Sequence, residues 1–437
     1  MKRDVYKNLV VWKNSRLRKP VILRGARQVG KTYILKKFAE SEYSNYVYLD
    51  FEDDPALDSE FSQKFDIERF IDFFEIYCQT KVQKEKTLII FDEIQASPNA
   101  LNSLKYFKEY APEYHIAAAG SLLGVQLCRK PSFPVGKVDF IDMYPLNFME
   151  FLNAAGKPEL RKLIERKKNL TPFSETFHIE LINILKKYYF VGGMPEAVAA
   201  YKNKESFTVI RQIQNNILDS YLRDFAKHAG KADVMKITNV WQSIPRHLSK
   251  ENRKFTFSAI KKSARARDYE SAIQWLLNAG LIYLSYDISK PGLPLSAYKE
   301  DRFFKVYMFD VGLLGALSKL DIGVLINGKE IFSHFSGALT ENYVAQQLYP
   351  EFERELYYWT SKGKAEVDFV LPYRNAVYPL EVKAGINLKS KNLKVYGQKY
   401  VPPNLSFIGA INMNKERGVY NYPLYAVSSF PLPQDNQ

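Results

Sequence analysis

Cysteine and long apolar runs are both scarce in this chain of 437 residues. Its two cysteines, Cys78 and Cys128, cannot build a disulfide framework or, by themselves, a zinc site, so we give them no role. No apolar run approaches the roughly 18 residues that cross a bilayer, and the first residues lack the apolar core of a signal peptide. We therefore expect a cytoplasmic protein with no membrane partner.

Acidic residues are too few to balance the basic ones, and the imbalance is local. The chain has 62 Lys and Arg against 48 Asp and Glu, a net charge of +14. Residues 151–300 hold 25 of the basic and 14 of the acidic residues, an excess of 11, whereas the flanking parts are nearly neutral. A composition of 46% hydrophobic and 25% charged residues indicates a globular chain of two to four domains. The basic middle indicates a polyanion partner, with a solvated surface as the simpler alternative.

One stretch fits the phosphate-binding pattern G-x-x-x-x-G-K-[ST] at each fixed position: Gly25, Ala26, Arg27, Gln28, Val29, Gly30, Lys31 and Thr32. In such a loop, glycines let backbone N–H groups turn toward phosphate, Lys31 reaches the β- and γ-phosphate oxygens, and the Thr32 hydroxyl binds Mg²⁺. An apolar run at 20–23 precedes the loop and a helical pattern at 33–39 follows it, which is the order that the motif requires. The sequence therefore predicts that the chain binds ATP and Mg²⁺.

Two carboxylates follow the next strong strand pattern, at residues 87–91. Asp92 and Glu93 come about 60 residues after the phosphate-binding stretch, the place where P-loop enzymes keep a Mg²⁺ ligand and a catalytic base. We expect Asp92 to hold Mg²⁺ through water and Glu93 to polarise the attacking water. A further strand at 115–121 ends in Ser121, our candidate for a sensor of the γ-phosphate, although a plain strand-to-loop turn is a nearly equal alternative.

Helical patterns fill residues 151–230 and are interrupted at Gly192-Gly-Met-Pro195. We interpret this region as a helical lid. ATPases that form rings need an arginine from a neighbouring subunit, so a homo-oligomer would require one here. Arg223 and Arg246 are candidates by position only, and surface salt bridges explain each of them more simply.

Residues 231–312 show the element order of a winged helix. The expected elements are helices at 233–248, 256–262 and 268–280 and wing strands at 281–286 and 305–309. Winged helices bind DNA in some proteins and other proteins in others, so the order alone leaves both partners open.

Local charge favours DNA as the partner of this region. Between residues 246 and 267 there are eight basic residues against one acid, Glu251. The third helix and the turn before it would meet phosphates and the major groove. The residues expected to contact DNA are Lys261, Lys262, Arg265 and Arg267.

The C-terminal part, residues 313–437, has the order of a nuclease-like domain. An amphipathic helix is expected at 338–348, and strands are expected at 356–360, 366–371 and 377–384.

Acidic residues in this part fall at informative places. Asp368 lies on one expected strand, and Glu381 and Lys383 lie on the next. Because Glu381 and Lys383 are two residues apart, their side chains point to the same face of that strand. Asp368 and Glu381 would bind Mg²⁺, Lys383 would offset charge at a scissile phosphate, and Glu341 would complete the set. Charged residues on an edge strand also serve to prevent aggregation, which is the alternative.

Over nearly its full length the chain resembles a large prokaryotic family of AAA+-like P-loop ATPases. In that family the C-terminal half is an uncharacterised domain with a winged helix and a PD-(D/E)xK restriction-endonuclease-like core. The matching text is Gly25-Ala-Arg-Gln-Val-Gly-Lys-Thr32, Phe91-Asp-Glu-Ile-Gln95, Tyr144-Pro-Leu-Asn-Phe148, Gly192-Gly-Met-Pro195, Phe309-Asp-Val-Gly-Leu313 and the set Asp368, Glu381 and Lys383. Where relatives tend to have Thr-Gly-Ser at the sensor strand, this chain has Ala119-Gly-Ser121.

The resemblance implies an α/β fold built from four parts. These are an AAA+-like P-loop sheet at 1–150, a helical lid at 151–230, a winged helix at 231–312 and a smaller α/β nuclease-like domain at 313–437. From the phosphate-binding motif, the two carboxylates and the basic middle we expect a Mg²⁺-dependent ATPase that acts on DNA or is bound to it, with a nuclease-like C-terminal domain. The alternative is a nucleotide-switched module with slow ATP turnover, a protein partner and no nuclease activity.

Overall fold

The computed structural model describes residues 1–121, 136–250, 253–321, 323, 336–352, 354–361, 365–384 and 391–432. Cys128 and Glu251 lie outside these residues. The chain divides into two compact units. The N-terminal unit comprises residues 1–144 with 278–280, and the C-terminal unit comprises residues 145–277 and 281–437.

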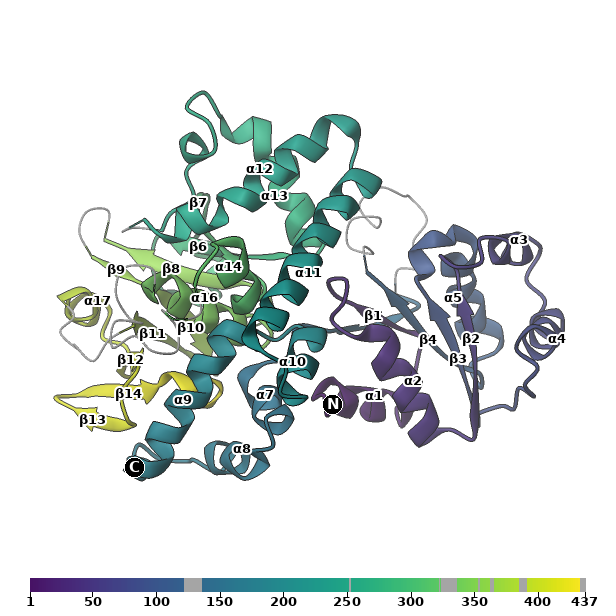
Figure 1. Ribbon diagram of the computed structural model, residues 1–437, viewed down its shortest axis with the longest axis horizontal. Coiled ribbons are helices and arrows are strands. Elements are labelled where there is room, and N and C mark those ends of the chain that lie inside the picture. Colours follow the sequence, from purple (N-terminus) through teal and green to yellow (C-terminus); the bar gives the residue numbers. More distant parts are fainter. Residues whose placement is uncertain are drawn as a thin grey trace. The chain divides into compact units, whose positions relative to one another are not determined.

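A five-stranded parallel sheet forms the centre of the N-terminal unit, in the order β2-β3-β4-β1-β5 (Figure 1). Its strands are β1 (Val21–Arg24), β2 (Asn45–Asp50), β3 (Thr87–Asp92), β4 (His115–Gly120) and β5 (Asp139–Asp142). Strands β3 and β4 are buried along their whole length, as expected of parallel strands that are covered on both faces. The predicted α/β class with a parallel P-loop sheet is confirmed.

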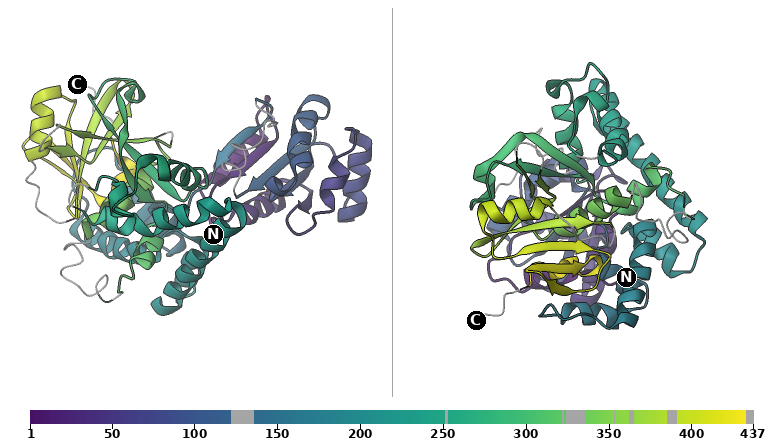
Figure 2. Two further views of the ribbon diagram at one scale, coloured as in Figure 1. Left: turned by 90° about the horizontal axis from the view of Figure 1, so that it is seen from above. Right: turned by 90° about the vertical axis from the view of Figure 1, so that its left-hand side faces the viewer.

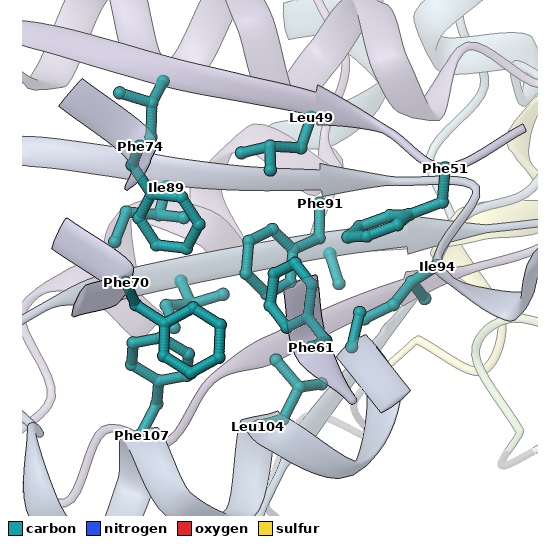
Figure 3. Close-up of a cluster of buried hydrophobic side chains, with 14 of the residues drawn as sticks. Leu49, Phe51, Phe61, Phe70, Phe74, Ile89, Phe91, Ile94, Leu104 and Phe107 are labelled. Atoms are coloured by element: carbon teal, nitrogen blue, oxygen red, sulfur yellow. The ribbon is translucent and has the colours of Figure 1, made fainter. Parts of the chain in front are cut away.

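Helices cover both faces of this sheet (Figure 1). They are α1 (Val5–Lys13), α2 (Lys31–Glu42), α3 (Leu57–Phe61), α4 (Ile67–Cys78) and α5 (Pro98–Tyr110). Helices α3, α4 and α5 pack on one face through a cluster that includes six buried phenylalanines (Figure 3). On the other face Trp12 of α1 contacts Phe38 of α2, with ring centroids 6.4 Å apart. This packing fixes the sheet edge from which the phosphate-binding loop extends.

The C-terminal unit begins with the helices predicted between residues 151 and 230. They are α7 (Phe148–Ala154), α8 (Pro158–Glu165), α9 (Glu175–Val191), α10 (Pro195–Lys202) and α11 (Phe207–His228). No helix within the described ranges combines the length and the hydrophobicity needed to cross a membrane.

A helical segment and an antiparallel hairpin follow. Their elements are α12 (Lys231–Leu248), the 3₁₀ turn η2 (Phe257–Ala259), α13 (Ala266–Asn278), β6 (Ile282–Ile288) and β7 (Lys299–Met308). The helix predicted at 256–262 is wrong, because only the turn η2 forms there. The chain before that turn is extended: Lys254 makes a β-bridge with Lys305, and the Phe255 N–H donates to the Phe304 carbonyl. This pairing leaves room for a single turn before α13.

Two further sheets complete the C-terminal unit, with orders β7-β6-β8-β9 and β10-β11-β12-β14-β13. The strands beyond the hairpin are β8 (Leu356–Thr360), β9 (Glu366–Val367), β10 (Phe369–Tyr373), β11 (Ala376–Lys383), β12 (Leu405–Gly409), β13 (Asn414–Glu416) and β14 (Val419–Pro423). The single strand predicted at 366–371 is divided at Asp368, because β9 pairs with β8 in one sheet and β10 pairs with β11 in the other. The hairpin β6–β7 therefore shares a sheet with strands from the C-terminal part.

The helix predicted at 338–348 exists as α16 (Ser336–Leu348), but it is not amphipathic in its surroundings. Its polar residues Thr340, Glu341 and Asn342 are fully buried. Asn342 exchanges two hydrogen bonds with the backbone of Met308, at 2.7 and 2.9 Å, and the Tyr343 hydroxyl donates to a backbone carbonyl at 3.1 Å. Asn342 and Tyr343 of α16 are thus satisfied by protein groups, whereas an amphipathic helix would present its polar side chains to water.

Helices α16 and α17 (Lys391–Tyr400) cover opposite faces of the sheet that contains β10. Val370 belongs to a buried cluster with residues of α17, whereas the neighbouring Phe369 contacts Tyr307, whose hydroxyl bonds to α16. Successive residues of a strand point to opposite faces, so the two contacts assign the two helices. The right-hand view of Figure 2 shows this sheet in green to yellow with α17 beside it.

Motifs that the sequence singled out meet at Asp310, which precedes α14 (Val311–Leu317). Its carboxylate accepts hydrogen bonds from the N–H groups of Gly193 at 2.6 Å and Leu313 at 2.9 Å. Gly192 has a φ of 71°, and a Cβ there would lie 2.3 Å from the Asp310 carboxylate, so glycine is required. Burial raises the pKa of Asp310 to about 6, although these N–H donors oppose the shift. The motifs at 192–195 and 309–313 thus pack against each other, and the contact between them is buried.

Candidate functional site

The phosphate-binding pattern forms the turn between β1 and α2. Gly30 precedes α2 with a φ of 92°, and a Cβ on Gly25 would lie only 2.0 Å from the Met143 carbonyl oxygen. Both positions therefore need glycine. Because α2 begins at Lys31, the N–H groups of its first turn lack carbonyl partners within the helix and belong to the loop. A helix N-terminus of this kind favours an anion.

Lys31 is buried inside this turn. Its Nζ donates to the carbonyl oxygens of Gly25 at 3.0 Å and Ala26 at 2.8 Å. Burial lowers the pKa of Lys31 to about 8, although the carboxylates of Glu93 and Asp92 oppose the shift. The ammonium is thus held by neutral oxygens in a desolvated place, which leaves it suited to a phosphate.

Asp92 and Thr32, the predicted Mg²⁺ ligands, are in contact. The Asp92 carboxylate is buried and accepts hydrogen bonds from the Thr32 side chain and, at 2.9 Å, from the Tyr48 hydroxyl. Burial raises the pKa of Asp92, and these donors oppose the shift. Hydroxyl and carboxylate oxygens are ligands that Mg²⁺ prefers, so the residues present fit this ion.

Glu93 leaves the strand in a left-handed conformation, with a φ of 45°. Its carboxylate accepts a hydrogen bond from the Ser121 hydroxyl at 3.0 Å and another from the Gln95 amide. The Arg27 guanidinium in turn donates to the Ser121 hydroxyl at 3.3 Å and pairs with Glu52 at 2.8 Å. The expected catalytic base and the expected sensor are therefore joined in one network.

The sequence predicts Arg27 only as part of the phosphate-binding loop, and it predicts no role for Gln95 or Glu52. Gln95 reaches Glu93 because the chain turns sharply at Glu93, a conformation that the sequence does not reveal. For Glu52 the sequence gives no signal, since its partner Arg27 lies 25 residues earlier.

The basic residues between 246 and 267 divide into two groups. In the first group, Arg253 and Lys254 form ion pairs with Glu341 and Asp287. Arg246 donates to the Ala259 carbonyl at 2.7 Å, and Lys250 donates to the Thr256 hydroxyl at 2.6 Å. The second group lies in the turn before α13 and at its start, and all of its members are exposed: Lys261, Lys262, Arg265 and Arg267.

The other candidate arginine finger, Arg223, lies on α11 and is exposed.

In the C-terminal unit, two of the predicted metal ligands meet around a lysine. The fully buried Lys305 Nζ lies 3.1 Å from Glu341 Oε1, 2.6 Å from Glu366 Oε1 and 3.7 Å from Asp368 Oδ1. The Tyr307 hydroxyl donates to Glu341 at 2.5 Å. Lys305 and Glu366 were not predicted to belong to this site. Lys305 and Tyr307 lie two residues apart on β7, so their side chains point to the same face of the strand.

The other two predicted residues form a separate pair. Lys383 Nζ lies 2.5 Å from Glu381 Oε1, and the second Asp368 oxygen accepts the Val382 N–H at 2.8 Å. In the parts of the chain that the structure describes, no group of three or more His, Cys, Asp or Glu side chains is arranged to hold a metal ion. The residues present therefore do not fit the Mg²⁺ that a nuclease-like core implies.

Family models match three separate parts of the chain. Residues 17–152 match an AAA domain, residues 182–322 match a domain of unknown function (DUF8612), and residues 336–426 match a second domain of unknown function (DUF4143). No curated protein matches the chain. The N-terminal unit is thus an AAA-type P-loop domain.

Similar solved structures include the Walker-type ATPase PABY2304 of Pyrococcus abyssi, at 12% identity over 72% of this chain and 95% of that chain, with a TM-score of 0.45. The Aeropyrum pernix ORC1 protein in complex with DNA matches at 12% identity over 72% and 90%, with a TM-score of 0.30. The Thermotoga maritima RuvB Holliday junction branch migration motor matches at 12% identity over 64% and 89%, with a TM-score of 0.30.

Proposed function

We propose that this chain is a Mg²⁺-dependent ATPase of the AAA type. The observation that carries the proposal is the buried Lys31 ammonium, which carbonyl oxygens hold near the Thr32–Asp92 pair. A phosphate would give this ammonium an anionic partner. Lys31 would bind the β- and γ-phosphates, and Thr32 and Asp92 would hold Mg²⁺, which supplies positive charge against the phosphates when bound.

Glu93 is the proposed base that orients and polarises water. Its carboxylate is held by the Ser121 hydroxyl and the Gln95 amide, so these two act as positioning residues. Arg27 bonds to Ser121 from within the phosphate-binding loop and so connects the loop to the base. A nucleotide bound in the loop would therefore influence the position of the Glu93 carboxylate through Arg27 and Ser121.

Glu93→Gln separates binding from turnover. The variant should bind ATP normally and lose phosphate release, because an amide cannot accept the proton of water. Ser121→Ala should lower kcat more than it changes KM, since it removes a positioning hydrogen bond. Binding is measured by calorimetry and turnover by phosphate release in Mg²⁺. The control is Lys37→Ala, which removes an exposed lysine of α2, the helix that begins at Lys31. Full turnover by the Glu93 variant would overturn the assignment of the base.

A second function, DNA binding, is favoured by the exposed basic residues at the start of α13. They crowd on one short segment, between the turn η2 and the start of α13, and the antiparallel hairpin β6–β7 follows α13 in the chain. Contacts of this kind bind phosphates with little dependence on sequence. The alternative is a protein partner, with ATP turnover acting as a slow switch.

Salt dependence distinguishes DNA from a protein partner. Replacing Lys261, Lys262, Arg265 and Arg267 together by Ala should weaken duplex binding and reduce the salt slope by about one unit for each DNA phosphate that is no longer neutralised. The control replaces four exposed basic residues elsewhere in the unit: Arg166, Lys168, Lys202 and Lys204. Unchanged affinity in the first variant would favour the protein partner. The ATPase rate with and without duplex DNA then tests whether the two functions are coupled.

A further inference from the structure

The Lys305 cluster, defined here as Arg253, Lys305, Tyr307, Glu341, Glu366 and Asp368, joins segments far apart in the chain. Lys305 and Glu341 are fully buried, and the Glu366 and Asp368 side chains are 23% and 15% exposed. Arg253 pairs with the second oxygen of Glu341. The carboxylates come from α16, from β9 and from the junction where the chain passes from one sheet to the other.

An ammonium occupies the centre of this carboxylate set. Lys305 Nζ reaches one oxygen of each of the three acids at 2.6 to 3.7 Å. A divalent cation would need the same oxygens at about 2.0 to 2.6 Å, and its charge would repel an ammonium held among them. The lysine and a metal ion therefore compete for one place.

We propose that Lys305 is an internal cation that takes the place of a metal ion in this set, so that the C-terminal unit assembles its carboxylates without Mg²⁺ and does not cleave phosphodiesters. Two further observations agree. Arg253 adds a second positive charge, and Glu381, the remaining acid expected at the metal, is already paired with Lys383. The cluster instead connects β7 and Arg253 to α16 and β9.

The test uses the lanthanide Tb³⁺, which binds oxygen ligands as Ca²⁺ does and emits when a nearby tyrosine transfers energy to it. Tyr307 is suited to this because its hydroxyl bonds to Glu341. Every protein in this experiment carries Tyr48→Phe. Tyr48 bonds to Asp92 and would otherwise transfer energy to a Tb³⁺ ion bound at Thr32 and Asp92. The signal that counts is the emission that disappears on adding Tyr307→Phe.

The full chain with Lys305 intact should show no Tyr307-dependent emission, and Lys305→Met should gain it because the carboxylates are released. If Lys305→Met does not fold, Lys305→Met/Glu341→Gln removes the unpaired buried carboxylate and leaves Glu366 and Asp368 as ligands. Tyr307-dependent emission with Lys305 intact would overturn the proposal. So would a folded variant without Lys305 that gains none, or Mn²⁺-dependent DNA cleavage that is abolished in Asp368→Ala.

Discussion

Lys31 and Lys305 are both buried lysines near carboxylates, but their direct partners differ. Lys31 Nζ bonds to two carbonyl oxygens, whereas Lys305 Nζ lies among three carboxylates. Burying a charge is costly unless an opposite charge compensates it. Three carboxylates offset the cost at Lys305 within the fold, whereas at Lys31 the carbonyl oxygens and the nearby carboxylates offset it only in part, and a bound anion would offset the rest. The partners of a buried cation thus indicate whether it is available to a ligand.

Removing each lysine in turn should give the largest contrast. Lys305→Met leaves Glu341 buried with less compensation, so unfolding free energy should fall by about 3 to 5 kcal/mol. Lys31→Met should leave that free energy unchanged or slightly higher, because no carboxylate loses a direct partner, yet ATP binding should be lost. Urea unfolding and calorimetric titration with ATP measure the two effects. A Lys305→Met protein as stable as the parent would remove the contrast.

Asp310 extends the comparison to a buried anion with neutral donors. Burial raises its pKa to about 6, above the usual value near 4, so the folded chain holds this proton more tightly than the unfolded chain does. The stabilisation is complete below pH 4 and is lost as pH rises through 6, a change of about 3 kcal/mol.

Unfolding free energies measured between pH 4 and 7 in Asp310→Asn and the parent should therefore diverge. The parent should lose stability relative to the variant as pH increases. Parallel curves would show that the Asp310 carboxyl keeps its ordinary pKa.

Proton uptake by Lys31 when ATP binds should be the smallest of these effects. It is also the most direct evidence that the Lys31 ammonium is available to a ligand. With a pKa of about 8, about half of the free protein carries a neutral Lys31 at pH 8, and bound phosphates should restore the proton. Binding enthalpy at pH 8 should vary with the ionisation enthalpy of the buffer, and affinity should fall up to about tenfold for each pH unit above 8. Lys31→Arg, which keeps its charge, should show neither dependence. Equal enthalpies in all buffers would contradict the shifted pKa.

The N-terminal site was largely predictable because its parts are local. The loop is one run of eight residues, and Asp92 and Glu93 end a strand whose apolar pattern is unmistakable. Its sheet follows from the same strand–loop–helix order. The contact of Ser121 with Glu93 could not be foreseen in detail, because it depends on which strands are neighbours.

The C-terminal cluster was not predictable for the opposite reason. Lys305 meets Glu341, Glu366 and Asp368 across 36 to 63 residues, and those meetings depend on the pairing of β6 with β8 and the change of sheet at Asp368. Helix α16 misled because polar side chains at helical spacing look the same whether they face water or buried backbone. Only the surrounding chain decides between the two.

The buried position of α16 also has a consequence for the order of folding during synthesis. The Phe148 N–H bonds to Gln347, 199 residues later, and the Tyr343 hydroxyl bonds to a carbonyl 81 residues beyond it. Apart from residues 278–280, the N-terminal unit is complete once residue 144 has emerged. The helices from 148 to 228 can pack on one another earlier, but their contacts with α16, such as the bonds of Gln347 to Phe148 and of Gln346 to Tyr188, form only after α16 has been made. A ribosome that stalls between residues 230 and 336 would therefore hold a nearly complete N-terminal unit followed by helices that still lack their contacts with α16.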